Sequence, residues 1–200
     1  KAASAAKKFL NESELLALID YVNSATGIFN IVSAAGRAEA YYGIDFFQRV
    51  IVVYVETLNS ALNKLYSNTD FSKHEIIMFK GIHLGRLEGL FNRAHLENSY
   101  HQGSLIAFPH PVSGTIDIDE SYANTKYDRG YQHELMLTIP VAADVDAFHD
   151  TQTRGQKEII APAGLRFIVT EKYQREVPIA STGSTGLIEG YKLRYITSDE

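Results

Sequence analysis

The hydrophobic spacing of the chain changes from helical to strand-like near Asn68, and this change most constrains the fold. Before it, apolar residues recur at steps of three and four from about Ile44 to Tyr66, as in an amphipathic helix. After it, short apolar runs between turn residues predict β-strands at 75–79, 104–108, 134–140, 158–160, 165–170 and 190–196. Helices followed by strands are typical of an α+β domain, with the long helix packed on a sheet.

The first residues of the chain also predict helices. From Ala2 to about Asn23 the apolar spacing is again helical, and we expect two helices there. Asn11 or Ser13 is expected to cap the second helix, because a side-chain oxygen at that position accepts a hydrogen bond from a free backbone N–H of the first turn.

Composition limits the size and class of the protein. With 200 residues, 45% of them hydrophobic, we expect one domain over residues 1–200, helical at about 1–70 and β-rich at about 71–200. The chain has no cysteine, so disulfides, thiolate nucleophiles and zinc–cysteine sites are excluded. A net charge of -5 argues against a protein that wraps nucleic acid. No signal peptide or bilayer-spanning stretch is evident, and Lys1 in place of an initiator Met suggests a trimmed chain or a piece of a longer one.

A paired amide and carboxylate stand at the start of an apolar run. Gln156 and Glu158 precede Ile159 and Ile160, and if all four belong to one strand, residues 156 and 158 share a face. The segment Pro162-Ala163-Gly164 follows, with proline and glycine at positions that suit a tight type I turn before the next strand. Such a pair can serve one substrate together, the carboxylate stabilising a cation and the amide orienting an acceptor.

This segment resembles the catalytic loop and strand of mono-ADP-ribosyltransferases of the Arg-Ser-Glu type. In that family, which includes the T-even phage enzymes Alt, ModA and ModB and bacterial ADP-ribosylating toxins, a Glu-x-Glu or Gln-x-Glu pair precedes a hydrophobic strand, a Pro-x-Gly turn and a second strand. The resemblance implies N-terminal helices and two packed β-sheets that frame a cleft for NAD, which is the substrate. It calls for no metal.

A first upstream element resembles the strand that holds the dinucleotide in this family. It is Ile76-Ile77-Met78-Phe79-Lys80-Gly81, and Lys80 stands where the family has arginine. The resemblance implies that Lys80 and Gly81 contact NAD. Lysine offers a point charge rather than the planar fork that grips phosphate bidentately, so this departure puts turnover in question.

A second upstream element resembles the strand and Ser-x-Ser/Thr turn of the family, followed by a short helix. It runs from Leu105 to Thr115, and the helix is expected from Asp119 to Tyr127. The resemblance implies that Ser113 braces the catalytic carboxylate by a hydrogen bond and lies beside NAD. The aromatic residue near nicotinamide is then Tyr122 or Tyr127, of which we favour Tyr127.

The resemblance assigns the chemistry to Glu158 and the choice of acceptor to Gln156. Glu158 would stabilise the positive charge that builds on the ribose as nicotinamide leaves. Family members that modify arginine usually carry glutamate where Gln156 stands, so the amide favours asparagine or a nucleobase, as in the clostridial Rho-modifying exoenzymes and the pierisin group. The phage likeness instead favours arginine on host transcription or translation proteins. A protein acceptor is preferred over nucleic acid, and we expect action in the host-cell cytoplasm after phage delivery or secretion, without a membrane partner.

Other interpretations stay open beside this one. Within enzymes the alternative is an NAD glycohydrolase, in which water accepts the ribosyl group. Outside enzymes it is a degenerate NAD-binding or interaction module that has lost turnover with its arginine. Each residue also has a purely structural interpretation. Residues 156–158 suit a charged strand edge that discourages aggregation, Lys80 suits a surface position, and Ser113 suits a turn.

Overall fold

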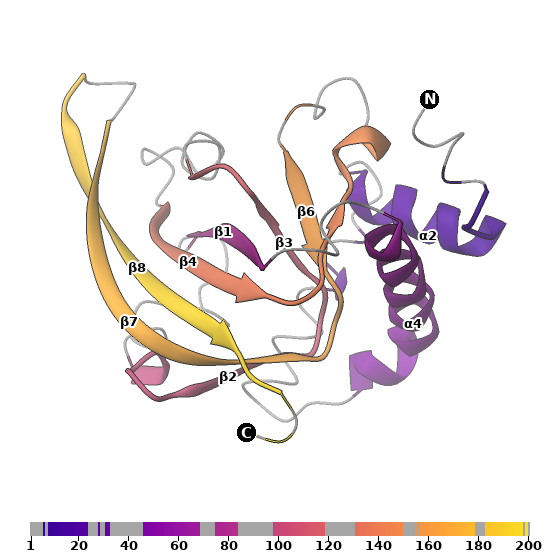
Figure 1. Cartoon of the computed structure of the whole chain (residues 1–200), viewed down its shortest axis with the longest axis horizontal. Helices are drawn as coiled ribbons and strands as arrows, with labels where there is room; N and C mark the ends of the chain where they lie inside the picture. The colour runs from indigo at the N-terminus through magenta and orange to yellow at the C-terminus, as the bar shows by residue number, and fades with distance from the viewer. Residues whose placement is uncertain are drawn as a thin grey trace. The chain divides into compact units, whose positions relative to one another are not determined.

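The computed structural model (Figure 1) describes most of the chain, namely residues 6, 8–23, 28, 31–32, 46–68, 75–83, 98–118, 131–149, 155, 157–178, 183–197 and 199. Its longer helices are α2 (Glu12–Val22) and α4 (Phe46–Ser67), and η4 (Asp146–Phe148) is a short 3-10 helix. The strands are β1 (Ile76–His83), β2 (Leu105–Phe108), β3 (Val112–Thr115), β4 (Tyr131–Ile139), β5 (Ala143–Asp144), β6 (Glu158–Ala161), β7 (Leu165–Pro178) and β8 (Thr185–Tyr195).

The chain divides into two compact units, each assembled from three separate segments. The first unit comprises Lys1–Ile76, Ala107–Ser113 and Pro140–Leu165. The second unit comprises Ile77–Ile106, Gly114–Ile139 and Arg166–Glu200. Both helices therefore belong to the first unit, and most of the long strands belong to the second.

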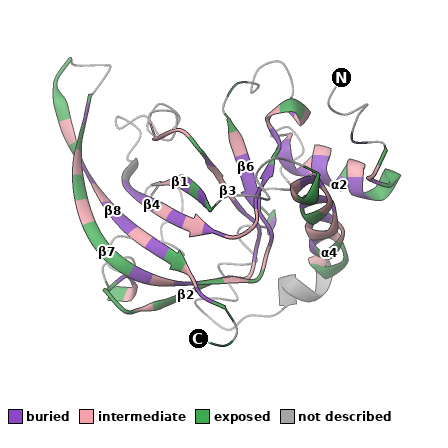
Figure 2. Cartoon of the chain, viewed as in Figure 1, coloured by how far each residue is buried: buried purple, intermediate pink, exposed green. Residues whose placement is uncertain are grey.

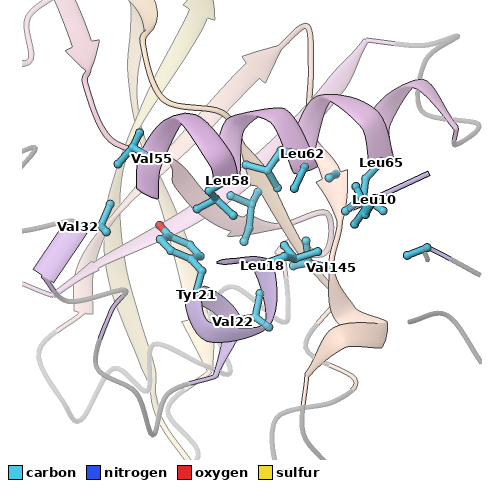
Figure 3. Close-up of a cluster of buried hydrophobic side chains, with 14 residues drawn as sticks. Leu10, Leu18, Tyr21, Val22, Val32, Val55, Leu58, Leu62, Leu65 and Val145 are labelled. Atoms are coloured by element: carbon cyan, nitrogen blue, oxygen red, sulfur yellow. The ribbon is translucent and has the colours of Figure 1, made fainter. Parts of the chain in front are cut away.

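The first unit is built around α2 and α4, which pack against each other. The apolar stripe of α4 includes Leu58 and Leu62, both fully buried, and α2 contributes Leu18 and Tyr21. Figure 3 shows these side chains gathered between the helices, together with Val145 from the segment after β5. Tyr54 on α4 also donates a 2.7 Å hydrogen bond to the backbone oxygen of Ala17 on α2. The predicted long helix thus packs on a second helix and, through Ala143 and Ile160, on strands β5 and β6.

A capping box defines the beginning of α2. The Glu14 backbone N–H donates to Asn11 Oδ1 at 2.8 Å, and the Asn11 N–H donates to Glu14 Oε2 at 2.9 Å. Glu14 is buried, and from α4 it also receives hydrogen bonds from Ser60 Oγ at 2.6 Å and Lys64 Nζ at 2.9 Å. The cap residue is therefore Asn11, one of the two candidates from the sequence, and the cap links the two helices.

The strands of the first unit follow the order β3-β6-β5. Strands β5 and β6 are antiparallel, with Asp144 opposite Ile159 and Ala143 opposite Ile160. After β6 the chain turns at Ala163 and Gly164, and Gly164 has φ 93°, a value that favours glycine. Asn59 on α4 accepts a 2.8 Å hydrogen bond from the Ala163 N–H, so the helix holds the turn at the end of β6.

In the second unit, strands β7, β8, β4 and β1 form a mixed sheet in that order. Strands β7 and β8 are antiparallel from Phe167 opposite Tyr195 to Pro178 opposite Thr185, with a bulge between Val169 and Glu171. Strand β4 runs parallel to β8. Along β8 the side chains of Tyr191 and Leu193 are buried and Tyr195 is half-buried, whereas Arg194 is exposed, as the sequence alternation predicts; Figure 2 shows how burial changes along the strand.

A buried charge cluster lies within the second unit. Glu134 on β4 is almost completely buried and accepts two hydrogen bonds from the Arg175 guanidinium, at 2.6 and 2.8 Å. Tyr173 on the same strand as Arg175 donates a third at 2.7 Å. Burial, together with this bond to Glu134, raises the pKa of Tyr173 well above its usual range. The cluster satisfies a carboxylate that would be costly to bury alone.

The α+β class predicted from the sequence is confirmed. Strands β2 and β6 have boundaries within one residue of the prediction, whereas β1, β4, β7 and β8 are longer than predicted. Strands β3 and β5 were not predicted. None of the helices within the described residues is long and apolar enough to cross a membrane.

Candidate active site

Glu158 is the first residue of β6, and the rest of that strand is buried. Ile159, Ile160 and Ala161 are almost fully covered, whereas the Glu158 side chain is 15% exposed. The backbone oxygen of Glu158 accepts a 3.1 Å hydrogen bond from the Val145 N–H. Pairing with β5 and burial of the isoleucines therefore fix the backbone that carries the carboxylate.

Both oxygens of the Glu158 carboxylate have a side-chain partner in the first unit. Ser113 Oγ on β3 donates a hydrogen bond to Oε1, and His149 Nε2, just after η4, contacts Oε2. When the carboxylate is ionised it can only accept, and Nε2 then carries the hydrogen of that contact. The His149 side chain is 4% exposed. The result is a carboxylate held by two donors from separate segments of the chain.

The backbone immediately before Glu158 has an uncommon conformation. Lys157 has φ 50°, in the left-handed region that residues other than glycine seldom adopt, and Gly155 has φ 100°. Asp146 stabilises this turn, because its Oδ1 accepts the N–H groups of Gly155 at 3.0 Å and Lys157 at 3.1 Å. The Asp146 N–H in turn donates to Asp144 Oδ1 at 3.0 Å.

The loop between β2 and β3 is also anchored, which bears on the position of Ser113. His110 is buried, and its Nδ1 lies 2.7 Å from the Pro111 oxygen. Tyr21 on α2 donates a longer hydrogen bond of 3.4 Å to the same oxygen. The segment that leads into β3 is thus attached to the helical core of the first unit.

This arrangement can stabilise positive charge. A carboxylate with some solvent access, fixed by two hydrogen-bond donors, is an electrostatic group that is oriented before a ligand arrives.

Within the described residues no group of three or more His, Asp or Glu side chains is arranged to hold a metal ion.

The structure brings together two of the site residues predicted from the sequence, Ser113 and Glu158. The hydrogen bond between them is the contact expected of Ser113. Its place in the fold differs from the prediction, because Ser113 lies inside strand β3 and not in a turn. Its hydroxyl donates to a partner 45 residues away along the chain.

The prediction that Gln156 and Glu158 share one strand face is wrong. Strand β6 begins at Glu158, and the left-handed Lys157 interrupts the extended backbone that face-sharing at two-residue spacing requires. Gln156 itself lies outside the described residues, so its role in choosing the acceptor stays a prediction.

The predicted dinucleotide-binding residues are placed only in part. Lys80 and Gly81 lie in the interior of β1, which continues to His83, and both are half-buried. The strand is thus longer than the one predicted at 75–79 and includes both residues. Tyr122, Tyr127 and the whole of the helix expected at 119–127 lie outside the described residues.

His149 and Asp146 are site residues that the sequence did not indicate. His149 fits no metal-binding spacing, and it precedes Glu158 by nine residues with no motif connecting them. Asp146 accepts hydrogen bonds from backbone N–H groups, and a contact with the backbone produces no recognisable pattern of side chains in the sequence. Only the pairing of β5 with β6 brings η4 beside Glu158.

Comparison with known proteins shows the fold. The sequence matches no protein-family profile and no curated protein. Solved structures do match: the ADP-ribosyltransferase HopU1 of Pseudomonas syringae pv. Tomato DC3000 is 19% identical, with a TM-score of 0.56 over 84% of this chain and 66% of its own. Plx2a, an ADP-ribosyltransferase toxin from Paenibacillus larvae, is 15% identical, with a TM-score of 0.59 over 97% of this chain and 90% of its own.

A third similar structure contains an analogue of NAD. Exoenzyme S from Pseudomonas aeruginosa, solved with carba-NAD and with human 14-3-3 protein beta, is 13% identical, with a TM-score of 0.57 over 92% of this chain and 74% of its own. At such identities the likeness is one of fold. The chain has an α+β, ADP-ribosyltransferase-like fold.

Proposed function

We propose that the protein is a mono-ADP-ribosyltransferase that transfers ADP-ribose from NAD to a macromolecule, with Glu158 as the catalytic carboxylate. The observation that carries the proposal is the Glu158 carboxylate, held at both oxygens at the start of β6 by Ser113 and His149. The shared fold with ADP-ribosyltransferases and with exoenzyme S bound to carba-NAD supports it.

The proposed reaction makes use of a fixed negative charge. The bond between the ribose C1′ and the nicotinamide nitrogen breaks, and nicotinamide leaves with the electron pair as a neutral molecule. The ribose becomes positively charged, so a nearby carboxylate is bound more strongly by the transition state than by the ground state. The acceptor atom then bonds to C1′ and loses its proton.

The other residues take the roles inferred from the resemblance. Ser113 braces Glu158, Lys80 and Gly81 contact the dinucleotide, Tyr127 lies near nicotinamide and Gln156 orients the acceptor. We take the acceptor to be a protein and the setting to be a host cell, because the similar structures include a toxin and an exoenzyme solved with a human protein. The whole chain would then act as one catalytic domain.

The test is release of nicotinamide and transfer of label from NAD in a cell lysate. Glu158→Gln keeps the shape of the side chain and removes its charge, and we expect it to lower the rate of nicotinamide release by about 10²- to 10³-fold. Ser113→Ala removes one of two donors, and roughly a 10-fold decrease is expected, the equivalent of one hydrogen bond. Glu176→Gln, at an exposed position of β7, is the matched control and should retain the wild-type rate.

The outcomes separate the alternatives. Label on a protein that disappears in Glu158→Gln supports the transferase. Release of nicotinamide without label on any macromolecule would contradict the transferase and indicate an NAD glycohydrolase. An inactive wild type that gains activity on Lys80→Arg would instead indicate a degenerate module that lacks only the bidentate fork of arginine.

A further inference from the structure

The segment from Asp146 to His149 contacts the side chain of Glu158 and the backbone just before it. From one end of η4, the Asp146 carboxylate accepts the N–H groups of Gly155 and Lys157. From the other end, His149 Nε2 contacts Glu158 Oε2. Just before Asp146, the Val145 N–H donates a hydrogen bond to the Glu158 backbone oxygen. We call residues 146–149 the η4 segment.

The contact of Asp146 compensates for an unfavourable backbone. The left-handed conformation of Lys157 costs free energy for a residue with a Cβ, and such conformations persist only where the surroundings impose them. A charged acceptor that binds the N–H groups of both Gly155 and Lys157 is a strong partner of this kind. Without it, the Lys157 backbone is free to relax, and the direction in which Glu158 leaves the turn changes with it.

The contact of His149 restricts the side chain. A glutamate side chain has three rotatable bonds, and one donor on Oε1 fixes only one end of the carboxylate. Ser113 on Oε1 and His149 on Oε2 approach from different segments, β3 and η4. Together they define both the position and the plane of the carboxylate.

We infer that Asp146 and His149 are positioning residues, which hold Glu158 in the single orientation needed for ribosyl transfer. This inference rests on the proposed function and adds two residues that do not touch the substrate. Misplacement of a catalytic group by about 1 Å reduces a rate by about 10²-fold. Loss of either contact should therefore lower kcat more than it changes KM.

The kinetic test uses a deletion, a conservative replacement and a matched control for His149. His149→Ala is expected to lower kcat for nicotinamide release roughly 10- to 100-fold while KM for NAD changes less than about 3-fold. His149→Gln returns an N–H donor near the place of Nε2 and should recover most of the rate. His101→Ala, at an exposed histidine of the second unit, should behave as wild type.

The structural test concerns Asp146 and requires no turnover. In Asp146→Ala the backbone amides of Gly155 and Lys157 should exchange their hydrogens at least about 10-fold faster with solvent, since they lose their acceptor. Asp146→Asn retains an oxygen at the position of Oδ1 and should preserve much of the protection. Asp199→Ala, an exposed carboxylate near the C-terminus, serves as the control.

The results decide as follows. Wild-type kcat in His149→Ala, or a decrease that His149→Gln does not recover, would overturn the role of His149. Unchanged amide exchange in Asp146→Ala would overturn the role of Asp146. If the wild type does not cleave NAD, the proposed function fails, and amide exchange still determines whether the η4 segment holds the turn before Glu158.

Discussion

Glu14 is a buried carboxylate whose charge contributes to folding. Burial alone would raise its pKa, but hydrogen bonds from Lys64, Ser60 and the Asn11 N–H outweigh it, and the pKa of Glu14 is lowered from its ordinary value of 4.5. A lowered pKa in the folded state means that the folded protein binds this proton less readily than the unfolded chain. The stabilisation is therefore fully present above about pH 4.5 and is lost as the pH falls through the folded value.

The charge of Glu14 should therefore make the stability of the protein depend on pH. At pH 7, Glu14→Gln should lower the free energy of unfolding by roughly 1–3 kcal/mol, because Lys64 and Ser60 lose a charged acceptor. At pH 3, below the ordinary value of 4.5, the difference from wild type should be smaller, since the unfolded chain there binds the proton more readily than the folded protein. Urea unfolding at both pH values measures this. Glu12→Gln, at an exposed position of the same helix, is the control, and an equal difference at both pH values would contradict the role of the charge.

At the scale of elements, β7 and β8 meet at a glycine. A Cβ placed on Gly190 would lie 2.0 Å from the ring of Tyr173, which stands opposite it on the neighbouring strand. The hydroxyl of the same tyrosine donates a hydrogen bond to Glu134 on β4. Because Gly190 has no Cβ, the Tyr173 ring can pass over β8 and reach Glu134 on β4.

A double-mutant cycle tests this packing. Gly190→Ala should destabilise the protein by roughly 2–3 kcal/mol, because the ring of Tyr173 must move and give up its bond to the buried Glu134. In a Tyr173→Leu background the same substitution should cost clearly less, since the overlap with the ring is gone. Thermal or urea unfolding of the wild type, the two single variants and the double variant gives the coupling free energy between residues 173 and 190. Equal costs in both backgrounds would show that the ring is not the obstacle.

The elements also show which information the sequence carried. Helix α4 and the apolar cores of β1, β6 and β8 were predictable, because burial of one face leaves a periodic pattern. Strand β5 has two residues, too few for any period, and β3 contains Ser113 and Gly114, which resemble a turn. Strand β7 continues through the polar residues 170–176, where its ladder with β8 rather than burial maintains the extended backbone.

The residues of the candidate site also divide into those that local sequence indicates and those that depend on tertiary contacts. Glu158 and Ser113 were identified through a resemblance in local sequence, and the structure brings them into contact. His149 and Asp146 depend on the pairing of β5 with β6, a tertiary event that no short motif records. Local sequence therefore indicated the proposed catalytic carboxylate and Ser113, but not His149 and Asp146.

At the scale of the whole molecule, the chain crosses between the two units several times, and neither unit is continuous in sequence. The core of the first unit needs Ala143, Val145 and Ile160, which lie far along the chain from α2 and α4. A fragment of residues 1–76 should therefore lack a cooperative thermal transition and show reduced helical circular dichroism, since helices without tertiary packing are marginal in water. Adding a fragment of residues 77–200 should restore the helical signal. Cooperative unfolding of the first fragment alone would contradict this account.

The exposed, left-handed Lys157 has a practical consequence for the entire chain. The protein contains neither cysteine nor tryptophan, so a thiol introduced by Lys157→Cys would be the sole attachment point for a maleimide dye and its emission would have no tryptophan background. The backbone at this position already carries a Cβ in the left-handed region, so the exchange adds no new strain. Fluorescence from that position would report, in real time and next to Glu158, whether the turn moves when a nucleotide arrives.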